Sequence, residues 1–429
     1  MFVSRTGSGR RSTVSPYSGT ISFERIGQDI AAIASFSESP SGDIAESGCN
    51  RPTFSSSWAA ACRYVIEKAS AVGCESKTDA HGNIHIRPSR CGWECPLWLC
   101  GSHLDSVPSG GKYDGVTGVV CALELLRTGV ELELIVFAEE EGTTFGLGML
   151  GSRSWVGALN RDELAAVHNR LGESYLEAGA PFGVDAAAMG SHQIDPSRYL
   201  GFIEVHPEQG LSLWNKGSAV AVVKRINGRR QYAVTMEGQG NHAGSTRMCE
   251  RRDAIVGAAQ AICEIERLGN SLSAEQDYTV LTVGRLDIIP NALNVIAGRC
   301  EFTVDFRAQS SEILDRGDAE LRSLLERICK TRQLPLSIKM TEDQPPVPLD
   351  ETVVQLLRTA ARSRGISLPE VPSGALHDAA IVASVLPTAM LFVPSRNGIS
   401  HHPDEFSRVE DVACAAELVA QVICDSGSA

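Results

Sequence analysis

The sequence predicts an α/β protein with a mixed, mostly parallel main sheet flanked by helices. Short apolar segments, which are typical of buried strands, alternate along the chain with segments of helical periodicity. Several apolar segments lead directly into polar residues, as happens at the carboxyl edge of an open α/β sheet. A central stretch alternates more openly between apolar and polar residues, which indicates a second domain of α+β type.

The elements of the main domain follow from these patterns. Strands are predicted at residues 83–87, 97–100, 132–137, 200–205 and 389–393. Helices are predicted where apolar residues recur with helical spacing, at residues 24–35, 57–72, 116–128, 351–364, 378–385 and 409–423.

The central stretch predicts a split βαβ sandwich that is inserted into the main domain. Its strands are expected at residues 231–237, 278–288 and 299–307, and its helices at residues 252–268 and 311–331. We therefore divide the chain into a disordered tail (1–22), a first part of the main domain (23–222), the insertion (223–334) and a second part of the main domain (335–429).

The composition is that of a globular protein with a substantial core. Of the 429 residues, 43 % are hydrophobic and 21 % are charged, and the formal net charge is −13. An acidic chain without a basic stripe argues against binding to nucleic acid or to an anionic membrane, and solubility explains the charge. No segment approaches the ~18 consecutive apolar residues that a transmembrane helix needs.

The N-terminal segment and the cysteines predict a cytoplasmic protein. Residues 1–20 are rich in Ser, Gly and Arg and lack the apolar region of a secretory signal, so a disordered tail is expected, with a transit peptide as the alternative. The 13 cysteines are odd in number and irregular in spacing, which favours free thiols in a reducing compartment. Cys91, Cys95 and Cys100 lie close together, but no fourth ligand at finger-like spacing completes a zinc site.

Five polar residues scattered over the chain have the chemistry of a two-metal site. Two divalent ions need imidazole and carboxylate ligands, one carboxylate to bridge them and a position left open for water. The candidate ligands, three imidazoles and two carboxylates in short motifs near the ends of apolar segments, are His103, Asp114, Glu141, His206 and His401. A single histidine is more often structural than metal-binding, so the prediction depends on the whole set.

The ordered motifs of the chain resemble those of the M20-type metallohydrolases. Within them they resemble the carbamoylase branch, which includes N-carbamoyl-L-amino-acid hydrolase, allantoate amidohydrolase and β-ureidopropionase. The resemblance covers residues 26–423, and HPEQG is its branch-specific segment, because many M20 peptidases have a carboxylate where this chain has His206. The matching segments are GSHLDSVPSGGKYDGVTGV, EEEGTTFGLGMLGSR, HPEQG, GNHAGSTRM with RRDA, NALNVIAGRCEFTVDFR, SGALHDA and FVPSRNGISHHPDE.

The resemblance implies a role for each candidate ligand. Asp114 would bridge two divalent ions, His103 and His206 would bind one of them, and Glu141 and His401 would bind the other. Zinc or manganese is the expected metal, with cobalt or nickel as alternatives, since histidine and carboxylate ligands suit all four.

Glu140 and Asp105 are the candidate catalytic residues beside these ligands. A carboxylate next to a metal-activated water can take its proton and return it to the leaving nitrogen, which is the role expected for Glu140. The family pattern ends in Glu-Glu-Gly, which assigns Glu140 as the base and Glu141 as the ligand and leaves Glu139 structural. Asp105 resembles the carboxylate that orients His103, with a cap at the strand end as the structural alternative.

Five residues resemble the substrate contacts of the family: Gln209, His242, Asn294, Arg307 and His377. Arg307 would bind a substrate carboxylate through its guanidinium fork, and His242 would stabilise the oxyanion. The structural alternatives are a surface ion pair for Arg307 and a turn residue for Asn294. His242, Asn294 and Arg307 fall in the insertion, which would therefore act as a lid and, by resemblance, as the interface of a homodimer.

The predicted function is hydrolysis of a linear amide or ureido C–N bond in a small, carboxylate-bearing substrate. An N-carbamoyl amino acid, allantoate or β-ureidopropionate would fit, and Leu376, Arg247 and Pro207 depart from the family pattern in ways that leave the substrate open. An M20 aminoacylase or dipeptidase is the first alternative. A binding protein on a retired hydrolase fold is the second, although every ligand position is filled.

Overall fold

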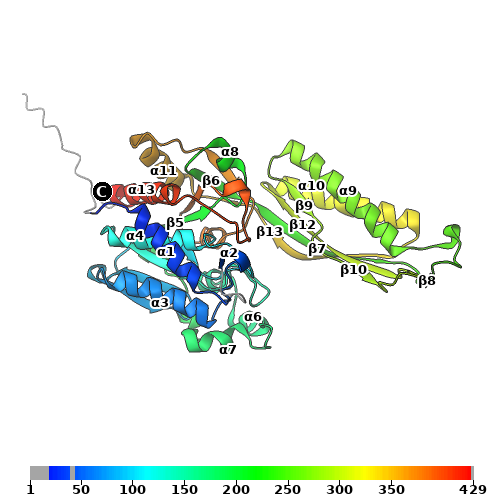
Figure 1. The fold of residues 1–429 in the computed structure, drawn as a ribbon, viewed down its shortest axis with the longest axis horizontal. Helices are drawn as coiled ribbons and strands as arrows, with labels where there is room; N and C mark the ends of the chain where they lie inside the picture. Colours follow the sequence, from blue (N-terminus) through cyan, green and yellow to red (C-terminus); the bar gives the residue numbers. More distant parts are fainter. Residues whose placement is uncertain (1–18, 39–43, 427–429) are drawn as a thin grey trace, which may run out of the picture. The chain divides into compact units, whose positions relative to one another are not determined.

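The computed structural model describes residues 19–38 and 44–426, and it divides into two compact units. The first unit comprises Met1–Ala221, Thr352–Pro369 and Ser384–Ala429, and the second comprises Val222–Glu351 and Glu370–Ala383. Figure 1 shows the ribbon of each unit. Residues 1–18 of the predicted tail lie outside the described residues, and helix α1 (Phe23–Ser35) begins directly after its capping residue Ser22.

The first unit is built on a mixed, mostly parallel sheet, which confirms the predicted fold class. Its strands lie in the order β1-β2-β4-β3-β5-β16. The neighbours β4, β3, β5 and β16 run parallel, whereas β1 and β2 are antiparallel and complete one edge. The bounds are β1 (Cys74–Thr78), β2 (Ile84–Pro88), β3 (Leu97–His103), β4 (Leu132–Phe137), β5 (Tyr199–Pro207) and β16 (Thr388–Val393).

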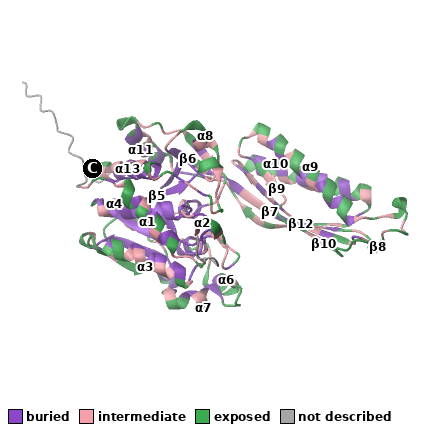
Figure 2. Ribbon diagram, viewed as in Figure 1, coloured by how far each residue is buried: buried purple, intermediate pink, exposed green. Residues whose placement is uncertain are grey.

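Helices cover this sheet and keep its strands out of solvent. Helices α1, α4 (Val116–Arg127) and α13 (Val409–Ser426) pack on one another, and α4 and α13 also pack on the parallel strands. Helix α3 (Ser56–Ser70) packs on the edge strands β1 and β2. Strands β3, β4 and β16 are buried along their whole length, as expected for parallel strands covered by helices (Figure 2).

The second unit contains an antiparallel sheet covered by two long helices. Its strands lie in the order β10-β12-β7-β13, and β9 also pairs with β12. Buried and partly exposed residues alternate along β12, so the sheet turns one face to a core under the helices. The bounds are β7 (Gly228–Glu237), β9 (Val280–Thr282), β10 (Leu286–Ile289), β12 (Arg299–Ala308), β13 (Leu336–Gln344), α9 (Ala254–Glu275) and α10 (Ser311–Arg332).

Two details of the second unit differ from the sequence prediction. The strand expected at residues 278–288 is interrupted around Gly284, so that β9 and β10 pair separately with β12. The unit also continues past the boundary predicted at residue 334, because β13 pairs with β7 over its length. Strand β13 is nowhere fully buried, and it therefore lacks the apolar signal that marked the other strands.

No helix within residues 19–38 and 44–426 has the length and apolar character that crossing a membrane requires.

Candidate metal centre

The candidate ligands of the first unit gather at the carboxyl edge of its parallel strands. His103 is the last residue of β3, where it pairs with Phe137 of β4, and His206 lies near the end of β5 opposite Phe392 of β16. The predicted strands ended at residues 100 and 205, before both histidines, which was wrong by three and two residues, because strand pairing continues to His103 and Pro207. Asp114, Glu141 and His401 lie in the loops that precede α4 and follow β4 and β16.

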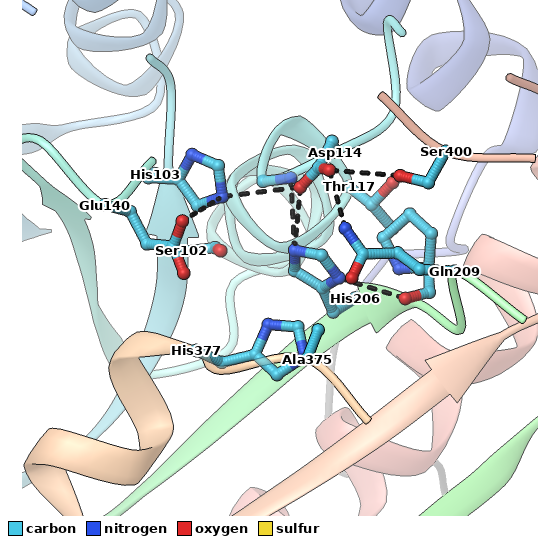
Figure 3. Close-up of polar contacts among 12 residues, drawn as sticks. Ser102, His103, Asp114, Thr117, Glu140, His206, Gln209, Ala375, His377 and Ser400 are labelled. Carbon is cyan, nitrogen blue, oxygen red and sulfur yellow. Dashed lines mark hydrogen bonds and ion pairs between the residues drawn. The ribbon is translucent and has the colours of Figure 1, made fainter. Parts of the chain in front are cut away.

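His103, His206 and Asp114 form a buried group in which both imidazoles face the same oxygen of Asp114. The Nε2 atom of His206 lies 3.0 Å from Asp114 Oδ1, and the Nε2 atom of His103 lies 3.5 Å from the same oxygen. The two imidazole rings are stacked, with their centroids 6.0 Å apart. Figure 3 shows the rings and the carboxylate turned toward one another, so the group can hold a metal ion.

The remaining ligands gather around the other oxygen of Asp114. The Nε2 atom of His401 lies 3.2 Å from Asp114 Oδ2 and 3.6 Å from Glu141 Oε2. Asp114 thus belongs to two groups, each able to hold an ion, and turns a different oxygen to each. His401 is half-exposed, whereas the side chain of Glu141 is only 6 % exposed, which leaves one side of this second group accessible to solvent.

The electrostatics of this cluster are those of a cation site. Burial disfavours the charged form of Asp114, yet the contacts with His103, His206 and His401 hold its pKa well below its usual range. Burial, followed by the charge of Asp114, raises the pKa of Glu141 to about 8. Contact with Asp114 raises the pKa of His401 to about 9. The two carboxylates therefore cannot both carry their charge at low cost unless a positive charge lies between them.

Buried polar atoms without a hydrogen-bond partner also indicate a cation site. Among the described residues, His103 Nε2 and Glu141 Oε1 are buried without a hydrogen-bond partner. Buried polar atoms normally have a hydrogen-bond partner, and atoms that bind an ion are one of the recognised exceptions. The donor set of imidazole and carboxylate groups fits zinc or manganese, so the residues present fit the expected metal.

The outer hydrogen bonds of the two buried histidines aim their Nε2 atoms at Asp114. The Nδ1 atom of His103 lies 3.1 Å from the carbonyl oxygen of Asp105, and that of His206 lies 3.0 Å from the carbonyl oxygen of Pro207. Because a carbonyl oxygen can only accept, each Nδ1 carries the proton and each Nε2 is left to bind a metal. Asp105 also accepts the backbone N–H of Glu141 through Oδ2 at 3.1 Å, so it orients two ligands.

The three consecutive glutamates point to different partners. Glu139 is fully buried, and its Oε1 accepts the backbone N–H groups of Thr144 and Phe145 at 2.8 Å each, which holds the loop after β4. Glu140 turns its carboxylate toward His103, with Oε2 at 3.7 Å from Nε2 (Figure 3). This divergence supports the register in which Glu139 is structural and Glu140 stands beside the metal ligands.

Gln209 is the candidate substrate contact that lies in the same unit as the ligands. Its Nε2 donates to Asp114 Oδ2 at 2.7 Å, and its backbone N–H donates to Ser395 Oγ at 3.1 Å. The residue has a left-handed backbone conformation, with φ of 57°. Its side-chain amide therefore contacts the ligand shared by both groups.

His242 and Asn294 are brought together in the second unit. His242 of β8 (Asn241–His242) pairs with Val295 of β11 (Val295–Ile296), and the N–H of Ala243 donates to the carbonyl oxygen of Asn294. The Nδ1 atom of His242 accepts the N–H groups of Gly244 and Ser245. The neutral ring therefore carries its proton on Nε2, and this exposed N–H can donate to a ligand.

Arg307 is also in the second unit, where Asp305 orients its guanidinium group. Its Nε donates to Asp305 Oδ1 at 2.7 Å, its Nη2 to Asp305 Oδ2 at 3.3 Å and its Nη1 to the carbonyl oxygen of Gly374 at 3.0 Å. A guanidinium has five N–H donors, so one on each terminal nitrogen remains beyond these bonds with described residues. His377 is buried, and its Nε2 atom lies 3.0 Å from Ser373 Oγ, within hydrogen-bond distance.

Glu405 and Ser400 were not predicted from the sequence, yet both contact the candidate ligand Asp114. Glu405 accepts the backbone N–H of Asp114 and the hydroxyl of Ser400, and Ser400 Oγ also lies 3.2 Å from Asp114 Oδ2. Both residues belong to the motif that contains His401, so a signal was available in the chain. Their roles depend on contacts with a loop nearly 300 positions away, which periodicity and spacing do not reveal.

The fold and this centre define a metal-dependent hydrolase of the α/β class, and comparison with known proteins agrees. The family model described as Peptidase family M20/M25/M40 matches residues 99–425. The chain belongs to this family.

Its relatives place it in the carbamoylase branch. It is 34 % identical to N-carbamoyl-L-amino-acid amidohydrolase from Paenarthrobacter aurescens, over 93 % of this chain and 97 % of that protein. It is 31 % identical to allantoate amidohydrolase from Escherichia coli K12, over 93 % and 97 % of the two chains. A solved amidase of the hydantoinase/carbamoylase family from Burkholderia multivorans superposes with a TM-score of 0.81 at 30 % identity, covering 95 % of this chain and 98 % of the other. The protein is thus a hydrolase acting on C–N bonds other than peptide bonds.

Proposed function

We propose that the protein is a two-metal amidohydrolase that cleaves the ureido or linear amide C–N bond of a small ureido acid. The substrate class comprises N-carbamoyl amino acids and related compounds such as allantoate and β-ureidopropionate. The observation that carries the proposal is Asp114, which turns Oδ1 to His103 and His206 and Oδ2 to His401. A carboxylate placed in this way can bridge two cations.

The ligands divide between two ions in this proposal. His103 and His206 hold one ion, Glu141 and His401 hold the other, and Asp114 is shared. Zinc or manganese is the favoured metal, and cobalt or nickel would also suit the ligands. When bound, the ions supply Lewis acidity that activates water and polarises the scissile carbonyl.

Glu140 is the proposed general base, which transfers the proton of the attacking water. Its carboxylate lies beside the ligand His103 and is 10 % exposed, so it is close to the ligands and shielded from bulk water. It takes a proton from the attacking water and returns it to the leaving nitrogen. Asp105 keeps His103 and Glu141 in place through the bonds described above. For an N-carbamoyl amino acid, the products are the amino acid, ammonia and carbon dioxide.

The substrate contacts are Gln209, His242, Asn294, Arg307 and His377 in this proposal. Arg307 binds the substrate carboxylate, because each of its terminal nitrogens keeps one N–H beyond the bonds to Asp305 and Gly374, and a guanidinium can donate to both oxygens of a carboxylate. His242 offers its Nε2 proton to the oxyanion that forms as water adds to the carbonyl.

The second unit is the proposed interface of a homodimer. Its described residues include several exposed large apolar side chains, among them Met248 at 79 % and Ile289 at 51 % exposure and Leu293, which is fully exposed. Exposed apolar patches often mark protein–protein contacts, and a second copy of this chain is the partner we propose. All thirteen cysteines are free, which suits the reducing cytoplasm proposed as its compartment.

Ammonia release from a panel of substrates tests the function. The protein is stripped of metal, reloaded with zinc or manganese, and given N-carbamoyl amino acids, allantoate, β-ureidopropionate, N-acetyl amino acids and dipeptides. We expect turnover of one or more ureido acids and little of the others. Preference for the N-acetyl amino acids or dipeptides would contradict the proposal, and failure to bind metal would point to a binding protein.

A further inference from the structure

The side chain of Glu405 connects the two loops that carry Asp114 and His401. Its Oε2 accepts the backbone N–H groups of Tyr113 at 2.9 Å and Asp114 at 3.1 Å. Its Oε1 accepts the hydroxyl of Ser400 at 2.8 Å. Asp114 and Glu405 are 291 positions apart in the chain, so this one carboxylate joins segments that the sequence keeps separate.

The environment of Glu405 is that of a fixed structural acceptor. The residue is 2 % exposed, and both of its oxygens are used by donors from these loops. Ser400 Oγ also lies 3.2 Å from Asp114 Oδ2, the oxygen that faces His401. Glu405 therefore holds Asp114 in two ways. It accepts the backbone N–H of Asp114 directly, and it holds the hydroxyl of Ser400 beside the carboxylate of Asp114.

Gly111 makes room for this carboxylate. A Cβ atom added at Gly111 would lie 2.0 Å from Glu405 Oε2 and 2.5 Å from its Cβ, far inside contact distance. The backbone of Gly111 is not in the left-handed region, so alanine is excluded by the side chain of Glu405 alone.

His401 needs such support more than the other imidazole ligands. His103 and His206 lie in paired strands and are buried, and each Nδ1 is held by a backbone carbonyl. His401 lies in a loop, is half-exposed and has a φ of 55°, a left-handed conformation that is strained for a residue with a side chain. The adjacent Ser400, bonded to Glu405, gives this loop a second contact with Asp114 besides that of His401 itself.

We propose that Glu405 is a positioning residue that sets the metal affinity of the Asp114, Glu141 and His401 group. The inference rests on the proposed function, in which this group binds the second of two ions. Outer partners of metal ligands change metal affinity by about 10–100-fold when they are removed. Loss of Glu405 should therefore weaken the ion at Glu141 and His401 by this factor. The ion at His103 and His206 also uses Asp114 but should be weakened much less, because these two histidines keep their own backbone hydrogen bonds.

Competition between the protein and a zinc chelator, with the stoichiometry measured for each variant, tests the inference. Glu405→Gln keeps the shape of the side chain but replaces one acceptor oxygen by a donor, and Gly111→Ala should displace the intact carboxylate. Both variants should lose about 10–100-fold in affinity at one of two sites. Gly190→Ala is the matched control, since a Cβ there meets no atom within 4 Å. Glu410→Gln controls for removal of an exposed charge on the same segment.

Thermal unfolding of the metal-free and zinc-loaded forms separates positioning from a general loss of stability. The stabilisation that zinc adds should shrink in Glu405→Gln relative to the controls, and Ser400→Ala should give a smaller loss of the same kind if Glu405→Gln folds poorly. Wild-type affinity at both sites in Glu405→Gln and Gly111→Ala, or equal weakening of both sites, would overturn the inference. A wild-type protein that takes up no zinc would instead refute the proposed function, on which the inference depends.

Discussion

The two units hold their candidate functional residues in opposite ways. In the first unit, His103, Asp114 and His206 are at most 6 % exposed and are fixed by strand ends and outer hydrogen bonds. In the second unit, His242 and Asn294 are exposed and are ordered by a short strand pair and a turn. The comparison indicates that the metal centre is defined by burial and strand geometry. In the proposed function, substrate recognition instead depends on these exposed residues, whose partners would be bound molecules.

The largest effect is expected for Glu140, the proposed general base, which lies beside the buried His103. Glu140→Gln should lower kcat by about 10²–10⁴-fold, the usual contribution of a general base, while both metal ions stay bound. Steady-state ammonia release and elemental analysis of the same preparation check this. Retention of most of the activity would remove Glu140 from the mechanism, and loss of metal would make it a ligand instead.

The buried ionic residues of the first unit predict a pH-dependent stability that the exposed residues of the second cannot have. Burial disfavours the charged ring of His85, yet Asp79 and Glu133, at 3.2 Å and 2.6 Å from its nitrogens, raise its pKa to about 9. Since this lies above the unfolded value of 6.5, the stabilisation is fully present below that pH and is lost as the pH rises through about 9.

Replacing His85 tests this directly. His85→Gln should lower the free energy of unfolding by about 3 kcal/mol near pH 6, because it removes the cation that Asp79 and Glu133 share, although Glu133 keeps its buried ion pair with Arg87. The difference from wild type should shrink between about pH 6.5 and 9 in urea unfolding experiments. The exposed His168→Gln is the control. A difference that stays constant over this pH range would show that the ring is neutral in the folded protein.

A smaller effect is expected for Arg307 in the second unit. Arg307→Lys keeps the charge but loses the paired terminal N–H groups, so kcat/KM should fall by about 10–100-fold, mainly through KM, as for loss of about 1.5–3 kcal/mol of charged hydrogen bonding. Arg285→Lys, an exposed arginine paired with Asp287, should change little. Kinetics on a ureido acid and on its carboxamide analogue check this. An equal loss on both would mean that Arg307 does not bind the carboxylate.

Much of the first unit could be predicted from the sequence because its signals are local. Continuous apolar segments marked β3, β4, β5 and β16, and the polar residues near their ends proved to lie together. Glu405 could not be predicted, because its role comes from backbone donors of a distant loop. Strand β13 and the orientation of Arg307 by Asp305 were missed for a related reason, since exposed alternation and a neighbouring ion pair resemble ordinary surface features.

Zinc titration of the metal-stripped protein tests the central claim most directly, since that claim is a carboxylate shared between two ions. Wild type should bind two equivalents per chain, and Asp114→Asn should bind at most one, because an amide nitrogen cannot replace the second oxygen. Gly190→Ala should behave as wild type. A single equivalent in wild type, or two tight equivalents in Asp114→Asn, would contradict the account.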